Sequence, residues 1–294
     1  MAKVLITGAD GFTGHYLCAH LEEAGHEVIG VSRQPKNSRW IAADLLDRQT
    51  IARVVAAHRP SAVVHLAAIP HVAHGDIGEL YAVNVVGTRN LLAALAQGDY
   101  RPDAVLLASS ANVYGNAAQG TIDESVEPLP VNDYAISKLA AEHVARVWQA
   151  HLPITIVRPF NYTGVGQRTS FLLPKIVDHF RQRANEIELG NLNVVRDFSD
   201  VRDITRTYAH LLKSAVPGKT YNVCSGTGHS LLDVIHLVQD LSGHKLEIKV
   251  NPAFVRSNEV AKLVGSARLL RDDIGVNGHT PLKETLRWML ESEL

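Results

Sequence analysis

The chain alternates short apolar runs with longer segments in which apolar residues recur at helical spacing. Apolar runs of four or five residues predict buried strands at 3–7, 27–31, 40–43, 62–66, 104–108 and 154–157. Segments with a helical period lie between them, at 13–24, 50–58, 80–96 and 134–149. This βαβ rhythm predicts an α/β protein with a Rossmann-type, doubly wound parallel sheet that is covered by helices on both faces.

The regular alternation weakens after Pro159. Helical periodicity returns at 171–182, 203–213, 230–241 and 281–290, and one further strand is expected at 220–223. We therefore expect a dinucleotide-binding domain over residues 1–161, to which the chain returns around 200–223. Residues 162–199 and 224–294 are expected to form a smaller C-terminal lobe that binds substrate at the carboxyl edge of the sheet.

A glycine-rich turn joins the first predicted strand to the first predicted helix. Gly8, Gly11 and Gly14, with Phe12 between them, have the spacing G-x-x-G-x-x-G, a close variant of the Rossmann fingerprint. Gly8 permits a tight turn, Gly11 lets the backbone approach a pyrophosphate, and Gly14 allows the helix to pack closely on the strand. A plain strand-to-helix turn is the alternative, but the position at the start of a βαβ unit favours a dinucleotide site.

The end of the second strand indicates which dinucleotide is bound. An Asp or Glu there would accept a hydrogen bond from the ribose 2'-hydroxyl of NAD. The chain instead has Ser32 and Arg33, which can bind a 2'-phosphate through charge-assisted hydrogen bonds. The sequence therefore favours NADP(H) over NAD, and the alternative is a solvated arginine on a loop.

Tyr134 and Lys138 lie one helical turn apart, so both side chains share a helix face. A phenol has an ordinary pKa near 10, and a neighbouring ammonium group favours the phenolate. We expect Lys138 to lower the pKa of Tyr134 toward the working pH and make it a proton donor or acceptor. With the glycine turn, this pair predicts redox chemistry at a carbinol or carbonyl carbon.

These residues resemble the extended short-chain dehydrogenase/reductase family, in particular the members that act on nucleotide-diphosphate sugars. The resemblance covers essentially the whole chain. Its marks, in addition to the glycine turn and the Tyr134–Lys138 pair, are Asp44-Leu45, His65-Leu66-Ala67-Ala68, Asn84, the segment from Ser109 to Gly115, and Arg158-Pro159-Phe160-Asn161.

The resemblance implies roles for several of these residues. Asp44 and Leu45 are expected to hold the adenine, and Leu66, Ala67 and Ala68 to line the pyrophosphate and the nicotinamide ribose. Ser110 and Tyr134 would hydrogen-bond the oxygen on the reacting carbon, with Tyr134 as the proton donor and Lys138 on the nicotinamide ribose. The alternative is that Ser110 is only a serine of the turn at the end of the strand, and its neighbour Ser109 could be the residue with that structural role. Phe160 is expected to pack on the nicotinamide.

The turn after the catalytic serine narrows the expected reaction. Dehydratases of this family carry an acidic residue there, whereas Ala111 and Asn112 cannot exchange a proton with carbon near neutral pH. Plain reduction or oxidation at one carbon remains, unless Glu124 or His71 supplies the missing acid or base. The resemblance then implies NADPH-dependent reduction of the 4-keto group of GDP-4-dehydro-6-deoxy-D-mannose to GDP-D-rhamnose.

Candidate substrate residues lie mainly in the C-terminal lobe. Arg196 and Arg256 can bind a diphosphate through bidentate contacts, and Glu259 can accept hydrogen bonds from a ribose diol. The stretches around them resemble those of GDP-sugar enzymes, except that Ser257 replaces a proline. The remaining candidates for contacts with the GDP-linked 4-keto-6-deoxy sugar are Asn112, Asn161 and Asn191.

Composition excludes several other classes of function. The formal net charge of −1 gives no electrostatic reason to bind nucleic acid or an anionic membrane. Two cysteines make a disulfide framework improbable, and no apolar run is long enough to span a membrane. We expect a cytoplasmic protein that holds no metal and forms a homodimer. The alternatives are a nucleotide-sugar dehydratase or 4-epimerase and, from another class, a non-catalytic NADP-sensing protein.

Overall fold

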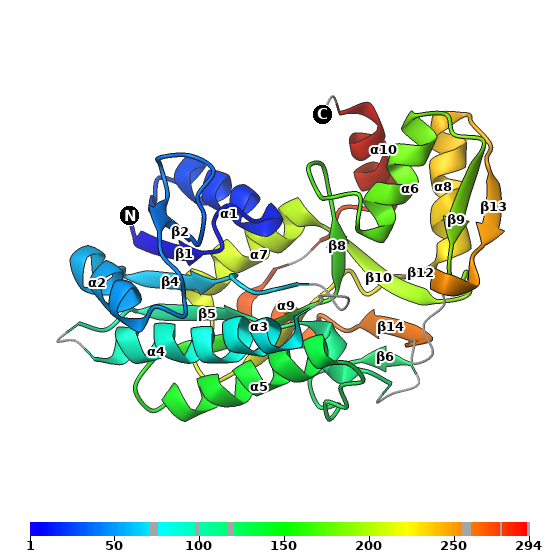
Figure 1. The fold of residues 1–294 in the computed structure, drawn as a ribbon. Helices are drawn as coiled ribbons and strands as arrows, with labels where there is room; N and C mark the ends of the chain where they lie inside the picture. The colour runs from blue at the N-terminus through cyan, green and yellow to red at the C-terminus, as the bar shows by residue number, and fades with distance from the viewer. Residues whose placement is uncertain (71–75, 98–99, 117–119, 255–259, 277, 293–294) are drawn as a thin grey trace.

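A seven-stranded parallel sheet forms the centre of the molecule (Figure 1). The computed structural model describes residues 1–70, 76–97, 100–116, 120–254, 260–276 and 278–292. In spatial order the strands are β11 (Thr220–Val223), β7 (Ile154–Pro159), β5 (Ala104–Ala108), β4 (Ala62–His65), β1 (Lys3–Thr7), β2 (Glu27–Ser32) and β3 (Ile41–Ala42). The order reverses between β1 and β4, which creates the switch point where open α/β sheets bind ligands. The predicted Rossmann-type sheet is confirmed.

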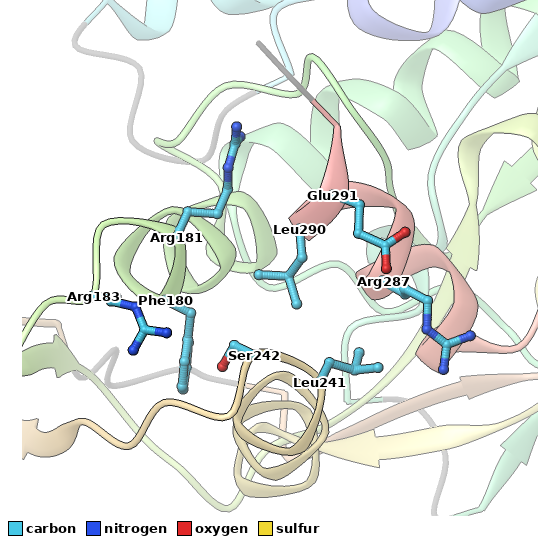
Figure 2. A pocket seen from close by; sticks show the side chains of 8 residues that line it. All are labelled: Phe180, Arg181, Arg183, Leu241, Ser242, Arg287, Leu290 and Glu291. Carbon is cyan, nitrogen blue, oxygen red and sulfur yellow. The ribbon is translucent and has the colours of Figure 1, made fainter.

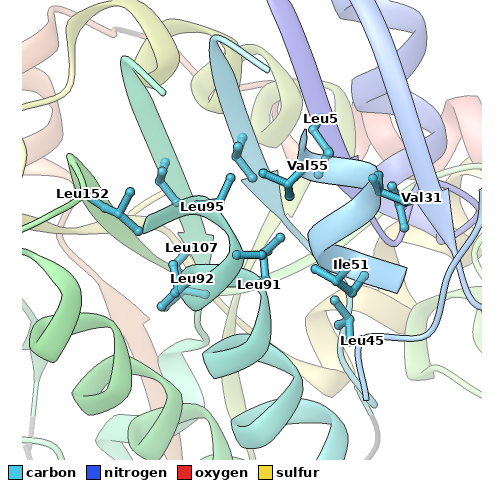
Figure 3. Close-up of a cluster of buried hydrophobic side chains, with 14 of the residues drawn as sticks. Leu5, Val31, Leu45, Ile51, Val55, Leu91, Leu92, Leu95, Leu107 and Leu152 are labelled. Atoms are coloured by element: carbon cyan, nitrogen blue, oxygen red, sulfur yellow. The ribbon is translucent and has the colours of Figure 1, made fainter. Parts of the chain in front are cut away.

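Helices cover both faces of this sheet. One face carries α2 (Arg48–His58), α4 (Thr88–Ala96) and α5 (Asp133–Trp148), and the other carries α1 (Phe12–Glu23), α7 (Val201–Ser214) and α9 (Arg268–Ile274). Figure 3 shows the first core, where Leu91, Leu92 and Leu95 of α4 pack between strand residues such as Leu107 and the side chains of α2. Because both faces are buried, apolar residues predominate along the strands and do not simply alternate with polar ones.

Local side-chain bonds set where the central helices begin. Asp47 caps α2 by accepting hydrogen bonds from the backbone N–H groups of Gln49 and Thr50, both at 3.1 Å. Asn132 caps α5 by accepting from the N–H of Ala135 at 2.9 Å. These bonds satisfy donors that have no partner inside the helix.

The segment predicted as a helix over 80–96 is helical throughout, but it is not one regular α-helix. It is divided into α3 (Ile77–Tyr81), a π-helical turn η1 (Ala82–Gly87) and α4. Within η1 the Asn84 side chain accepts from the N–H of Ile69 at 2.8 Å and donates to the hydroxyl of Ser137 at 3.0 Å. Such π-turns occur often at functional sites. Here the turn lets one buried amide tie the loop after β4 to helix α5.

A smaller lobe contains strands that the sequence did not predict. Strand β10 (Val195–Asp200) pairs with β8 (Asn161–Thr163), β12 (Gly228–Ser230) and β14 (Lys262–Gly265), and β14 also pairs with β6 (Thr121–Ile122). A separate pair consists of β9 (Glu186–Leu189) and β13 (Glu247–Val250). These strands are short and carry polar residues, so they give no apolar run to detect. Helices α6 (Leu172–Arg181), α8 (Leu231–Ser242) and α10 (Leu282–Glu291) pack together around their own apolar core.

Strand β10 connects this lobe to the central sheet. The fully buried Asp197 accepts hydrogen bonds from the backbone N–H groups of Ser225, Gly226 and Gly265 and from the Ser225 hydroxyl. The last residue of β10, Asp200, caps α7, which packs against α1. No helix in the described ranges combines the length and apolar character needed to cross a bilayer.

Candidate active site

The glycine turn lies at the switch point and is too crowded for side chains. Gly8 has φ +73°, and a Cβ there would meet the backbone nitrogen of Ala67 at 2.9 Å. A Cβ on Gly14 would lie 2.2 Å from the carbonyl oxygen of Gly8. The helix α1 begins at Phe12 with Gly11 as its N-cap, and that cap makes no side-chain hydrogen bond. The turn is therefore a backbone cradle at a helix N-terminus, which fits a pyrophosphate.

The end of β2 holds the two residues predicted to bind a 2'-phosphate. Ser32 is partly buried and Arg33 is exposed. Arg33 Nη1 lies 2.7 Å from Glu79 Oε1 of α3, and this hydrogen bond raises the pKa of the guanidinium. Sequence reasoning missed Glu79 because it lies far from Arg33 along the chain and matches no motif.

The loops after β3 and β4 approach the same edge. Asp44 is partly buried, and Leu45 is buried against Gly87 of η1. The N–H of Leu66 donates to the Thr7 carbonyl at 3.2 Å, and that of Ala67 donates to the Thr7 hydroxyl at 3.3 Å. The structure thus brings Leu66, Ala67 and, next to them, Ala68 beside the end of β1.

A buried histidine at the end of β4, His65, links the elements at this edge of the sheet. His65 Nδ1 lies 2.6 Å from the Thr7 hydroxyl, and Nε2 lies 2.9 Å from the Thr88 hydroxyl. Burial lowers the pKa of His65 to about 3, and the charge of Lys138 acts in the same direction. His65 is therefore a neutral ring that joins β1, β4 and α4 by hydrogen bonds.

Tyr134, Lys138 and Ser110 come together where β5 ends and α5 begins. Tyr134 forms a side-chain hydrogen bond with Ser110, which lowers its pKa, but burial dominates and raises the pKa to about 12. Lys138 is buried, and its Nζ donates to the Ala108 carbonyl at 2.5 Å. Burial lowers the pKa of Lys138 to about 8, so it is mostly charged at pH 7.

These values correct the expectation that Lys138 lowers the pKa of Tyr134 toward the working pH. Desolvation disfavours the phenolate more than the surrounding groups favour it, so Tyr134 is protonated at physiological pH. A protonated phenol that is hydrogen-bonded to a serine hydroxyl can donate a proton to an acceptor oxygen.

The structure separates the two serines at the end of β5. The Ser109 hydroxyl donates to Glu142 Oε1 at 2.6 Å, and Ser109 is only 5% exposed. Ser110 instead bonds Tyr134 and accepts from the N–H of Asn112 at 3.2 Å, which caps the short 3₁₀ turn η2 (Ala111–Tyr114). Ser110 is therefore the serine beside the phenol, and Ser109 belongs to a deeper network.

That deeper network is a fully buried ion pair, which sequence reasoning missed. Arg158 of β7 donates to both carboxylate oxygens of Glu142, from Nε at 2.9 Å and from Nη2 at 2.7 Å. Glu142 is one turn beyond Lys138 on α5, and its charge favours the ammonium form of Lys138. The spacing of Tyr134, Lys138 and Glu142 is the signal that could have revealed it.

Of the two alternative acid and base candidates, Glu124 is bonded elsewhere in the structure. Glu124 Oε1 accepts from the backbone N–H of Asn222 at 2.7 Å, and burial raises its pKa. His71 lies outside the described residues. Within the ranges that the structure describes, no group of three or more His, Cys, Asp or Glu residues is arranged to hold a metal ion.

The predicted substrate residues are only partly described. Asn161 of β8 donates to the Asp197 carbonyl at 3.5 Å, and Arg196 Nη1 donates to the Val195 carbonyl at 2.9 Å. Asn191 is exposed, and its side chain accepts from the N–H of Asn193. Arg256 and Glu259 lie outside the described residues.

Phe160 lies in an apolar cluster with Ala111, Val113, Tyr114, Ile122 and Leu263. It is 3% exposed. Its contact with a nicotinamide stays a prediction.

A separate recess of about 320 Å³ lies where α6, α8 and α10 end (Figure 2). Its apolar floor is formed by Phe180, Leu241 and Leu290, and Arg183 and Arg287 are on its sides. None of the candidate site residues that the structure describes lines this recess. We therefore place the candidate site at the carboxyl edge of the central sheet and not at this recess.

The sheet, its glycine turn and the Ser110–Tyr134–Lys138 group define a Rossmann-fold enzyme of the short-chain dehydrogenase/reductase type. Residues 4–224 match the NAD dependent epimerase/dehydratase family, and the chain belongs to that family.

Similar proteins include enzymes that are named for GDP-sugar chemistry. The chain is 35% identical to GDP-6-deoxy-D-talose 4-dehydrogenase of Aggregatibacter actinomycetemcomitans, over 93% of this chain and 91% of that protein. It is 34% identical to GDP-6-deoxy-D-mannose reductase of Pseudomonas aeruginosa, over 98% and 96% respectively. The structure of RMD from Pseudomonas aeruginosa complexed with NADPH matches with a TM-score of 0.87 at 33% identity, covering 98% of this chain and 97% of that chain.

Proposed function

We propose that the protein reduces the 4-keto group of GDP-4-dehydro-6-deoxy-D-mannose with NADPH and forms GDP-D-rhamnose. The observation that carries this proposal is the Tyr134 phenol hydrogen-bonded to Ser110, next to a turn whose residues Ala111 and Asn112 are neither acids nor thiols. The similarity to GDP-6-deoxy-D-mannose reductase over nearly the whole chain supports the substrate.

The glycine cradle fits a dinucleotide, because a Cβ at Gly8 or Gly14 would overlap neighbouring backbone. Gly8, Gly11, Phe12 and Gly14 would hold the pyrophosphate. Ser32 and Arg33 would hold the 2'-phosphate, and Asp44 and Leu45 the adenine. The pyrophosphate and the nicotinamide ribose would be lined by Leu66, Ala67 and Ala68. When bound, NADPH supplies the hydride.

The protein groups then handle the oxygen and the proton. The Ser110 hydroxyl and the Tyr134 phenol donate hydrogen bonds to the keto oxygen, which stabilises the negative charge that develops there. Tyr134 transfers its proton to this oxygen, and the charge of Lys138 stabilises the phenolate that is left. Lys138 would also hydrogen-bond the nicotinamide ribose.

The absence of an acid at Ala111 and Asn112 argues against dehydration and against epimerisation at a carbon beside the ketone, because both reactions need a proton to leave carbon. Glu124 is engaged with the backbone of Asn222 and is therefore not free to replace such an acid. Retention of Tyr134, Lys138 and Ser110 likewise argues against a non-catalytic NADP-sensing protein.

We assign the nucleotide sugar to the lobe formed by residues 162–199 and 224–294. Asn112 and Asn161 would orient the sugar. Arg196 and Arg256 would bind the diphosphate and Glu259 the ribose of GDP. Asn191 is a further candidate contact with this substrate. The protein is proposed to work in the cytoplasm as a homodimer. Ile136 and Val147 of α5 and Val86 of η1 are exposed apolar residues that a partner subunit would cover.

A second product is favoured by the similarity to GDP-6-deoxy-D-talose 4-dehydrogenase. Talose and mannose configurations differ at C4, so the face from which the hydride arrives decides between GDP-6-deoxy-D-talose and GDP-D-rhamnose. Proton NMR of the product separates them, because the coupling between H3 and H4 is large in the manno form and small in the talo form.

The direct test is NADPH consumption with a panel of GDP-, UDP-, CDP- and dTDP-linked 4-keto-6-deoxy sugars. We expect turnover with the GDP-linked sugar and little with the others. GDP-mannose and NADP+ serve as a control, since a dehydratase makes the 4-keto sugar unaided. Formation of that sugar, or no turnover with any member of the panel, would refute the proposal.

A further inference from the structure

The residue predicted to recognise the 2'-phosphate is already paired with a carboxylate. Arg33 follows β2 directly, and its Nη1 lies 2.7 Å from Glu79 Oε1. The side chains of Arg33 and Glu79 are 57% and 33% exposed, so both remain accessible to a ligand.

Glu79 is held in place by its surroundings. Its N–H donates to Asp76, the N-cap of α3, at 2.9 Å, and the next residue, Leu80, is fully buried. Tyr81, also of α3, donates to Asp133 at the start of α5 at 3.0 Å. The Glu79 carboxylate is therefore presented to Arg33 by an anchored helix.

The charges around Arg33 distinguish between the two coenzymes. Asp44 is a second carboxylate close enough to raise the pKa of Arg33. A phosphate monoester carries a charge of about −1.5 to −2 near pH 7. It would meet one guanidinium and two carboxylates, whereas the ribose hydroxyl of NADH brings no charge.

We propose that Glu79 is a coenzyme-specificity residue that competes with the 2'-phosphate of NADPH for Arg33. The Glu79 carboxylate weakens NADPH binding and leaves NADH binding nearly unchanged. It therefore reduces the preference for NADPH over NADH that Arg33 creates. This inference rests on the proposed function, since it concerns the coenzyme of the same site.

The test is a titration of the whole protein with NADPH and with NADH, followed by coenzyme fluorescence, in the unaltered protein and in Glu79→Gln. We expect the Kd for NADPH to fall about fivefold in Glu79→Gln, while the Kd for NADH changes less than about twofold. Glu186→Gln is the matched control, because Glu186 forms an exposed ion pair with Lys249 in the other lobe. Both Kd values should stay unchanged there.

The competition itself is tested in the Arg33→Ala background. Without the guanidinium there is nothing to compete for, so adding Glu79→Gln should change the Kd for NADPH much less than it does in the parent. An equal effect in both backgrounds, or an unchanged ratio of the two Kd values in Glu79→Gln, would overturn the inference while the proposed reduction stands. No binding of either coenzyme by the unaltered protein would instead refute the proposed function.

Discussion

Removing one partner of the buried pair of Glu142 and Arg158 should destabilise the protein strongly, because the other charge would remain buried without a counter-charge. Glu142 is 0% exposed and Arg158 is 3% exposed, and they share two hydrogen bonds of 2.9 and 2.7 Å. In Glu142→Gln the shape is kept, but the guanidinium loses its counter-charge in a place that water does not reach. Breaking a buried pair in this way typically costs about 3–5 kcal/mol.

Urea denaturation followed by circular dichroism measures this loss in the free energy of unfolding. The exposed pair of Glu186 and Lys249 provides the comparison, because Glu186→Gln should cost less than about 1 kcal/mol. Replacing both buried partners with apolar residues, as Glu142→Leu with Arg158→Met, should recover much of the stability, since no charge is then left unpaired.

A cost in Glu142→Gln as small as that of the surface control would refute the reasoning. It would show that water or rearranged side chains reach Arg158 and solvate it. A double variant that is less stable than Glu142→Gln would contradict the argument in another way, by showing that packing and not the unpaired charge determines the loss.

Two further predictions concern the site. Tyr134→Phe should bind NADPH with nearly the same Kd and lower kcat by about a hundredfold or more, because only the proton donor is lost; unchanged turnover would remove Tyr134 from the reaction. His65 has a pKa of about 3 in the folded protein against about 6.5 when unfolded, so the unfolded state binds more protons between these values and stability falls as the pH drops below 6.5. From pH 7 to pH 5 the free energy of unfolding, measured by urea titration, should therefore fall by about 2 kcal/mol more in the unaltered protein than in His65→Gln. Equal falls in the two proteins would contradict a neutral buried His65.

The central sheet was predictable because its strands are buried on both faces. Val63 and Val64 of β4, for example, lie within an uninterrupted apolar run, and the helices between such runs fix the parallel order. The strands of the smaller lobe escaped prediction because their stability comes from partners distant in sequence. Arg196 of β10 pairs with His229 on one side and with Leu263 on the other. The sequence around Arg196 gives no indication of these partners.

The candidate site was predictable where a motif places residues at a fixed spacing, as for Tyr134 and Lys138. It was not predictable where burial or a distant residue determines the chemistry. Burial raises the pKa of Tyr134 against the direction that the lysine suggested. Glu79 reaches Arg33 only through the fold, and the choice between Ser109 and Ser110 depends on which one faces the buried carboxylate of Glu142.

Strand β10 of the smaller lobe continues without a loop into α7, which packs on the central sheet. Asp197 fastens β10 inside the lobe through four hydrogen bonds, and Asp200 joins that strand end to α7 and, through Thr285, to α10. A swinging motion about this segment would expose two buried carboxylates together. We therefore expect the arrangement of β10 and α7 to be set when the chain folds, so that the proposed coenzyme and sugar would meet in a prearranged geometry.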